Sequence, residues 1–284
     1  MTEIYWNAVD LLKGGYDFHT HSDPSHLKRS LDDFELLEQA SAAGMAGTVV
    51  KNHYESTAAR AALLNKRGIY SAHAYGGLVL NWPSGGLNPY AAESALKLGA
   101  TFIWLPTRDA ENCLTHGNMT GDFFQRPGIS ILDKSGALLP VVYEILEIVR
   151  SYHAVFATGH VSTAEAVAAC HAARAMDIKT VLTHPEWERT KIPGEIQAQL
   201  AAEGVFIEKD WANLADGNCT GETMISNIRA AGCEHVFLAT DRGQIGKERP
   251  VEGMLRFIMF LLEHGFTGEE IRTMVHGVPE SMLA

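Results

Sequence analysis

The 284-residue sequence has few cysteines, and they form no paired motif. They are widely spaced and give no CxxC pair; they are Cys113, Cys170, Cys219 and Cys233. Such spacing predicts reduced thiols in a cytoplasmic protein rather than a disulfide framework. The first fifteen residues also lack a basic segment followed by an apolar core, so they do not predict a secretory signal.

Positive charge and long apolar runs are scarce as well. The net charge is -11 and no long Lys/Arg run occurs, which argues against nucleic acids and anionic membranes as partners. No apolar run approaches the ~20 residues of a membrane helix. The longest, around residues 254–262, is interrupted by Arg256 and predicts a packed helix. The remaining partner class is a small-molecule substrate. Symmetric homo-oligomers are common, but no interface signature predicts one here.

What the sequence does contain is a regular alternation of short apolar runs with helical patterns, typical of βα units. The runs cover residues 16–19, 47–51, 70–75, 101–105, 154–158, 180–183, 205–207 and 236–240. Eight such units predict an α/β protein, a (β/α)₈ TIM barrel forming a single domain over residues 1–284. An open doubly wound sheet is less favoured, because no Gly-rich phosphate loop follows the first run.

Helix starts and one irregular segment complete this outline. Capping boxes are predicted at residues 30–33, 162–165 and 267–270, each beginning with Ser or Thr. The stretch from about residue 106 to 140, rich in Gly, predicts an insertion after the fourth strand with a hairpin near residues 128–136. A loop this long in a compact domain is usually functional, for example as a lid.

Histidine is the informative residue type, with 13 copies. In a (β/α)₈ barrel the active site lies at the carboxyl ends of the strands. Polar residues that follow or end the predicted strands are His19, His21, Lys51, His53, His73, His160, His184, Glu208 and Asp241. Because side chains alternate along a strand, both histidines of His19-Thr-His21 should share one face. Histidines with a carboxylate form a nitrogen and oxygen ligand set suited to zinc, manganese or iron.

A single histidine at a strand end is more often a hydrogen-bonded polar residue than a metal ligand. The ordered set on strands one, five, six and eight is what favours a metal site. His53, His73 and Glu208 are expected to contact substrate or to orient a ligand. Arg108, Trp187 and Arg242 lie in loops on the same side and are expected substrate contacts.

This ordered set resembles the amidohydrolase superfamily, from about residue 16 to residue 244. That family carries His-x-His on strand one, histidines on strands five and six, and an aspartate on strand eight. The matching residues are His19, His21, His160, His184 and Asp241. The resemblance implies one or two divalent ions, zinc foremost, and hydrolysis of an amide, cyclic amide or ester (lactone) bond. It also implies that Asp241 takes a proton from water activated by the metal and passes it to the leaving group.

One feature departs from the family pattern. Binuclear members carry a carboxylated lysine or a glutamate at the end of strand four, where this sequence has Leu105-Pro-Thr107. Lys51 on the second strand is a candidate substitute. A lysine can bridge two cations only as a carbamate, since its ammonium form has no lone pair. The alternatives are that Lys51 binds a substrate anion or forms an ion pair.

The same residues favour or disfavour several alternative functions. A PHP-type phosphoesterase usually ends with Asp-x-His, whereas Asp241-Arg242-Gly243 lacks that histidine. A TatD-like nuclease is disfavoured by the acidic net charge. A one-metal decarboxylase of aromatic acids becomes the better hypothesis if Lys51 is not carboxylated. A silent metal-binding protein would be indicated by loss of one ligand, and none of the five is missing.

Overall fold

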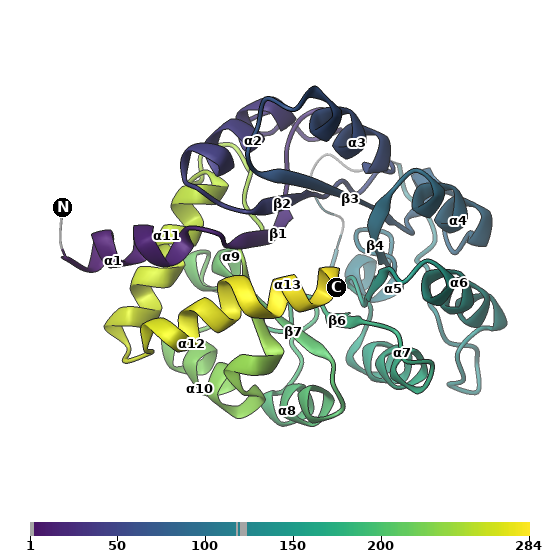
Figure 1. Cartoon of the computed structure of the whole chain (residues 1–284). Coiled ribbons are helices and arrows are strands. Elements are labelled where there is room, and N and C mark those ends of the chain that lie inside the picture. The colour runs from purple at the N-terminus through teal and green to yellow at the C-terminus, as the bar shows by residue number, and fades with distance from the viewer. Residues whose placement is uncertain (1–2, 118, 120–123) are drawn as a thin grey trace.

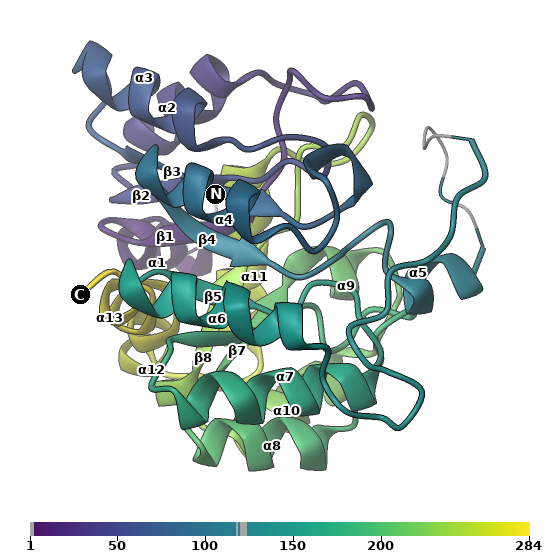
Figure 2. The same ribbon diagram turned by 90° about the vertical axis from the view of Figure 1, so that its right-hand side faces the viewer.

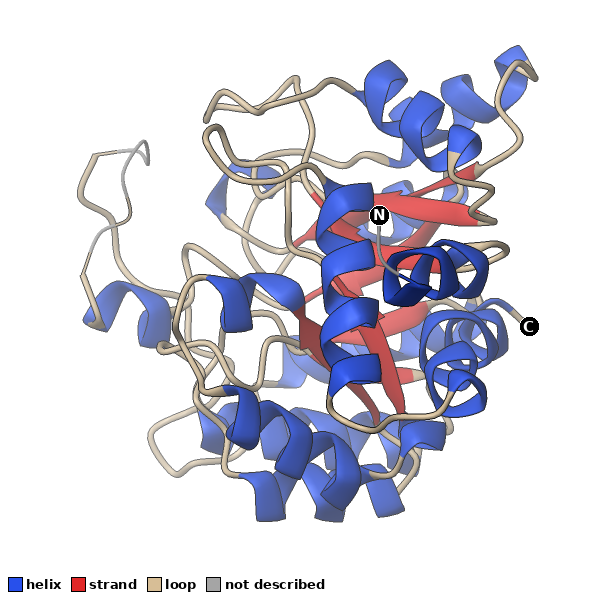
Figure 3. Cartoon of the chain, turned by 90° about the vertical axis from the view of Figure 1, so that its left-hand side faces the viewer, coloured by secondary structure: helices blue, strands red, loops and turns tan. Residues whose placement is uncertain are grey.

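The computed structural model describes residues 3–117, 119 and 124–284, and a sheet of eight parallel strands in sequence order lies at its centre. Helices surround this sheet on the outside (Figure 3). The strands are β1 (Tyr16–Thr20), β2 (Gly47–Val50), β3 (His73–Val79), β4 (Ala100–Trp104), β5 (Val155–Ala157), β6 (Thr180–Leu182), β7 (Phe206–Asp210) and β8 (Val236–Ala239). The predicted (β/α)₈ barrel is confirmed.

The helices pack around the sheet, most of them in an outer ring (Figure 1). They are α1 (Glu3–Leu12), α2 (Asp33–Ala42), α3 (Ala58–Arg67), α4 (Pro89–Lys97), α5 (Glu111–Thr115), α6 (Pro140–Ser151), α7 (Thr163–Ala175), α8 (Gly194–Ala202), α9 (Trp211–Ala215), α10 (Gly221–Ala231), α11 (Pro250–Glu263), α12 (Gly268–Arg272) and α13 (Val278–Leu283). No helix in the described part of the chain is both long and apolar enough to cross a membrane.

The barrel interior is apolar toward the amino ends of the strands. Phe18, Phe102 and Phe237 pack there with Trp104, and Val278 and Met282 of α13 join this cluster. Helix α13 crosses the axis of the barrel and covers that end (Figure 1). The carboxyl ends of the strands face the opposite side, where α5 and the insertion project (Figure 2). This arrangement leaves only one end of the barrel open to a substrate.

β1 lies beside β8, where the barrel closes, and its pairing with β2 contains a bulge. Asp17 pairs with Thr48 but Thr20 with Val50, so β1 carries one extra residue between them. The carboxylate of Asp17 accepts bonds from the backbone N–H groups of His19 (3.2 Å) and Thr240 (3.1 Å) and from the Thr240 hydroxyl (2.5 Å). The bulge resets the side-chain alternation, so that both Phe18 and His19 point into the barrel.

Several predicted boundaries shift. The third strand runs from His73 to Val79, not over residues 70–75, which moves its carboxyl end several residues along the chain. The first capping box begins at Asp32, which pairs with Glu35, rather than at residue 30. The boxes at Ser162 and Thr267 are confirmed.

The predicted insertion contains α5 and a short antiparallel bridge between Leu132 and Leu138, which places the hairpin slightly later than predicted. Its turn is closed where the Asp133 N–H donates to the carbonyl of Ala137, at 2.8 Å. Residues 118 and 120–123 of this insertion lie outside the described residues. Asn112 on α5 donates to the backbone carbonyls of His160 (3.1 Å) and Arg189 (2.8 Å), so the insertion is anchored beside the open end of the barrel.

Candidate metal centre at the mouth of the barrel

The structure brings the predicted ligands together at the carboxyl ends of the strands. We call this group the mouth site; it consists of His19, His21, Lys51, His160, His184 and Asp241. All are buried except Asp241, whose side chain is 21% exposed. The carboxylate of Asp241 is therefore the member of the group most accessible from solvent.

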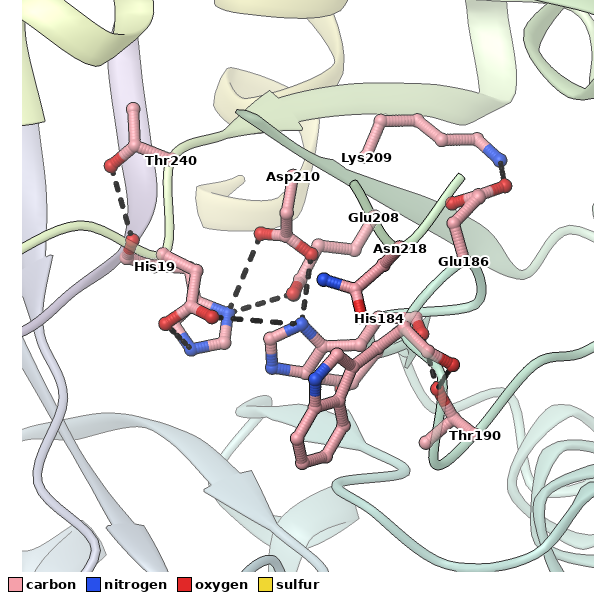
Figure 4. Close-up of polar contacts among 12 residues, drawn as sticks. His19, His184, Glu186, Thr190, Glu208, Lys209, Asp210, Asn218 and Thr240 are labelled. Carbon is pink, nitrogen blue, oxygen red and sulfur yellow. Dashed lines mark hydrogen bonds and ion pairs between the residues drawn. The ribbon is translucent and has the colours of Figure 1, made fainter. Parts of the chain in front are cut away.

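Three histidines of the mouth site are held through the same ring nitrogen. Nδ1 of His21 lies 3.0 Å from the backbone oxygen of Lys51. Nδ1 of His19 lies 2.7 Å from Glu208 Oε1, and Nδ1 of His184 lies 3.1 Å from Asp210 Oδ2 (Figure 4). A carbonyl or carboxylate oxygen only accepts, so these contacts favour a proton on Nδ1 of His19 and His21 and leave Nε2 as the ligand atom when a cation is bound.

The Nε2 atoms of two of these rings, His19 and His21, face Asp241. Its Oδ1 lies 3.0 Å from His21 Nε2 and 3.5 Å from His19 Nε2. Two ligands about 2.0–2.1 Å from a tetrahedral ion are about 3.3 Å apart. These separations are of that size, whereas the 2.7 Å contact between His19 and Glu208 is a direct hydrogen bond. A cation therefore fits among the Nε2 atoms and Asp241, with Glu208 and Asp210 behind the rings.

Unpartnered polar atoms support this fit. Both ring nitrogens of His160 are buried without a hydrogen-bond partner. Buried polar atoms in native proteins are almost always satisfied, and each exception requires an explanation. His160 packs against the ring of His184, with centroids 5.1 Å apart, so its unpartnered nitrogens lie beside the same group. The donor set suits zinc, manganese or iron.

Burial sets the protonation states needed for ligands. Burial, reinforced by the positive charges of Lys51 and Arg29 respectively, lowers the pKa of His19 and of His21 to about 3. Burial likewise lowers the pKa of His160 well below its usual value. Burial opposes ionisation of Asp241, but the neighbouring imidazoles outweigh it and hold its pKa well below the usual range. His184 differs: burial lowers its pKa, but the charges of Asp210 and Asp241 outweigh burial and raise it. The neutral rings of His19, His21 and His160 beside an ionised carboxylate are the forms that bind a divalent cation.

Two of these residues have strained backbones. His184 has φ 49° and Asp241 has φ 47°, the left-handed region that non-glycine residues rarely adopt. The strain at Asp241 is held by the bond from its N–H to the His19 carbonyl, at 2.8 Å. Such strain is concentrated at functional sites because surrounding packing must compensate for it.

Lys51 enters the centre of the mouth site from just beyond the end of β2. Its Nζ lies 2.9 Å from His19 Nε2 and 5.4 Å from the centroid of the Trp104 ring. Burial lowers the pKa of Lys51, while the charges of Glu208 and Asp241 oppose this. Since His19 Nε2 carries a lone pair, Lys51 is the donor in their hydrogen bond.

A cavity of about 470 Å³ opens above the mouth site. Of the predicted substrate contacts, His53, Arg108 and Trp187 line it. His53 is fixed by a 2.8 Å bond between its Nδ1 and Thr107 Oγ1. The indole of Trp187 packs edge-on to His160, with centroids 4.6 Å apart. This volume is within the range of small-molecule sites.

Two predicted contacts lie elsewhere. His73 begins β3 instead of ending it, so it lies at the far end of the barrel, exposed and bonded to Asn65. Arg242 points away from the cavity, where its guanidinium bonds Asp216 (2.9 and 3.1 Å) and Glu248 (2.9 Å). Both predictions were wrong, the first because the strand boundary was misplaced and the second because its ion-pair partners come from distant loops.

Three residues of the region were missed. Asp210 was overlooked because the seventh strand was expected to end at residue 207; extending the alternation from Glu208 would have found it. Asp17 supports the β1–β8 junction, and its place two residues before His19 was a usable signal. Arg29 lines the cavity from the loop after β1, and no sequence pattern marked it.

The chain belongs to a family described as a family of unknown function (DUF6282), whose model matches residues 14–208. No functionally curated protein matches its sequence. Among solved structures it is similar to an amidohydrolase from Pseudomonas aeruginosa, with 13% identity, a TM-score of 0.67, and 99% and 98% of the two chains covered.

An organophosphorus hydrolase from Deinococcus radiodurans is similar with a TM-score of 0.62 and 12% identity, covering 96% of this chain and 94% of that one. A 2,6-dihydroxybenzoate decarboxylase from Rhizobium is similar with a TM-score of 0.56 and 13% identity, covering 95% and 98%. The expected likeness to the amidohydrolase superfamily is thus confirmed in the fold.

Proposed function

We propose that this protein is a metal-dependent hydrolase that cleaves an amide, cyclic amide or ester (lactone) bond of a small molecule. One observation carries the proposal: the buried His19 and His21 present Nε2 toward one point, the ionised Asp241 lies at that point, and the rings of His160 and His184 pack beside it. The similar solved structures, which include hydrolases and a decarboxylase, support an enzyme of this fold.

The residues that would hold the ion are His19, His21, His160, His184 and Asp241, with Lys51 as a further candidate. A divalent ion in such a donor set polarises a carbonyl and lowers the pKa of water in the site. Asp241 then accepts the proton of the attacking water, because its carboxylate is ionised and partly exposed to the cavity. It returns that proton to the leaving group. Trp187 and the walls around it limit access of bulk water.

Lys51 determines whether the site holds one ion or two. Its present bond to His19 Nε2 uses the lone pair that a cation would need. A cation at His19 therefore opposes the ammonium form of Lys51 and favours the neutral amine, which is the form that adds carbon dioxide. We propose the carbamate as the bridging group. Two ions per chain that fall to one in Lys51→Met support it; a single ion in both proteins contradicts it.

The proposed function is tested by comparing a variant of a candidate ligand histidine with a variant of a surface histidine. His160 is buried with both nitrogens unpartnered, whereas His171 on α7 is half-exposed. Metal content per chain would be measured before and after chelation and after addition of Zn²⁺ or Mn²⁺. Hydrolysis of lactones, cyclic amides and p-nitrophenyl esters would be followed together with carbon dioxide release from aromatic acids.

We expect bound metal and metal-dependent hydrolysis in the wild type and in His171→Gln, and loss of both in His160→Gln. Carbon dioxide release without hydrolysis would instead assign the aromatic-acid decarboxylase. A protein that binds no metal at a stoichiometric level would contradict both functions.

A further inference from the structure

Arg29 is a buried arginine whose backbone is held by hydrogen bonds and whose side-chain Nε has no hydrogen-bond partner. Its N–H donates to Asp23 Oδ1 at 3.1 Å, and its backbone bridges to Gln244 in the loop after β8. The next residue, Ser30, donates its N–H to the carbonyl of Gly243 at 2.8 Å. The loop that carries Arg29 is therefore attached to the loop that carries Asp241, and its position relative to the mouth site is set by backbone bonds.

The guanidinium of Arg29 forms no hydrogen bond or ion pair with the described residues. The residue is 8% exposed, its Nε has no hydrogen-bond partner, and no carboxylate of the described residues forms an ion pair with it. Other arginines of this protein behave differently. Arg242 binds Asp216 and Glu248, and Arg60 binds Asp33 at 2.6 Å. A buried charge left without a partner is costly, so its retention indicates a partner that arrives from solvent.

The surroundings of Arg29 favour an anion as that partner. It lines the same cavity as Asp241, and Arg108, which is also buried, lines this cavity with its guanidinium 6.0 Å from the ring centroid of Tyr54. The acidic residues of this lining are Asp216 and Asp241. Asp216 is engaged by Arg242, and Asp241 is directed at His21. Among the described residues of the cavity wall, neither carboxylate therefore forms an ion pair with Arg29.

We propose that Arg29 binds an oxyanion of the substrate, a carboxylate or a phosphate, while the scissile bond lies at the mouth site. The planar guanidinium fork suits either group because it donates two parallel hydrogen bonds. This inference rests on the proposed function for the position of the scissile bond, and it makes Arg29 a specificity-determining residue. The substrate class is then a small anionic amide or ester.

The test uses benzoate and phenyl phosphate as anionic probes and benzamide as a neutral probe of similar shape. Binding to the full chain would be followed by titration calorimetry, once with Zn²⁺ or Mn²⁺ added and once after chelation. Arg29→Gln removes the charge and Arg29→Lys keeps it without the fork. The matched control is Arg256→Gln, which removes an exposed arginine of α11 that pairs with Glu252.

We expect at least one anion to bind more tightly than benzamide, and Arg29→Gln to weaken it about 10- to 100-fold, as for a charged hydrogen bond. Benzamide binding should be unchanged, Arg29→Lys should retain part of the affinity, and Arg256→Gln all of it. Because the Arg29 guanidinium forms no hydrogen bond or ion pair with the described residues, Arg29→Gln should melt no lower than the wild type. The preferred anion, benzoate or phenyl phosphate, then identifies the substrate group.

Equal anion affinity in Arg29→Gln and the wild type would overturn the inference, as would the absence of anion binding. Anion binding that is lost on chelation but unchanged in Arg29→Gln would show that the probe binds the metal ion. This result would also overturn the inference. Failure of the proposed function looks different. In that case no metal is bound, yet Arg29-dependent anion binding persists in untreated and chelated protein alike.

Discussion

The two faces of β7 carry two buried polar groups that differ in one respect. On the outer face Lys209 binds Glu186 (Figure 4). Lys209 also donates to Gln197 Oε1 at 2.5 Å, and Asn227 donates to the same Glu186 oxygen at 2.9 Å. We call these four residues the outer cluster.

On the inner face of β7, Glu208 and Asp210 face the histidines of the mouth site. There the nitrogens of His160 have no hydrogen-bond partner, and no lysine or arginine of the described residues forms an ion pair with Glu208 or Asp210. The comparison distinguishes two uses of buried polar groups. The outer cluster contains its own cation, Lys209, and holds the fold together, whereas the inner group has no such cation and is arranged for a ligand.

The largest effect is expected for Asp241→Asn. The amide keeps the shape of the side chain but cannot accept the proton of the attacking water. We expect turnover to fall by about 10²- to 10⁴-fold, while fold and most of the bound metal remain. Steady-state kinetics on any hydrolysed substrate would measure this, with the exposed Asp10→Asn of α1 as control. Near-normal turnover in Asp241→Asn would remove this residue from the chemistry.

The second prediction compares the two buried lysines directly. Lys209→Met leaves Glu186 buried without its cation, so the free energy of unfolding should fall by about 3–5 kcal/mol. Lys51 forms no ion pair in the described part of the chain, and Lys51→Met should cost clearly less stability. Urea unfolding of both variants measures the difference. Equal losses of stability would mean that Lys51 is as structural as Lys209.

The third prediction concerns the residues behind the histidines. Glu208→Gln weakens the bond that orients the His19 ring and should lower metal affinity about 10- to 100-fold. Competition with a calibrated chelator measures that affinity. Glu203→Gln, an exposed residue after α8, is the matched control. A Glu208→Gln protein that holds metal as tightly as the control would indicate that Glu208 is merely part of the barrel interior.

The smallest effect is a change in the pH dependence of stability. Burial raises the pKa of Asp17 to about 8, although bonds from Thr240 and His19 oppose this. The folded protein thus keeps a proton that the unfolded chain releases near pH 3.9. This contribution to stability is full below about pH 4 and is lost as pH rises to about 8.

Asp17→Asn imitates the protonated acid, since its amide can both donate to the Thr240 hydroxyl and accept the two N–H bonds. Urea unfolding of both proteins between pH 5 and 8 should show the wild type losing stability relative to Asp17→Asn. Parallel pH profiles would mean that Asp17 is ionised throughout this range.

Local periodicity made much of the fold predictable. Strands buried on both faces give continuous apolar runs, and these runs identified all eight strands and the end of the barrel where polar residues gather. Their ends were less accurate. The third strand was placed too early, which put His73 at the wrong end of the barrel, and the seventh was ended too soon, which hid Asp210. Strand ends depend on pairing with neighbouring strands, which a single run of residues does not contain.

By itself, the sequence determined the class of fold and the set His19, His21, His160, His184 and Asp241, because strand order and strand-end chemistry are local properties. Only the tertiary structure decided which charges are neutralised. Arg242 follows Asp241 directly yet is bound by Asp216 and Glu248, whereas Arg29, from a distant loop, faces the cavity without an ion-pair partner among the described residues. The physical reason is that a charge is satisfied by what lies near it in space, and loops brought together by the barrel set that neighbourhood.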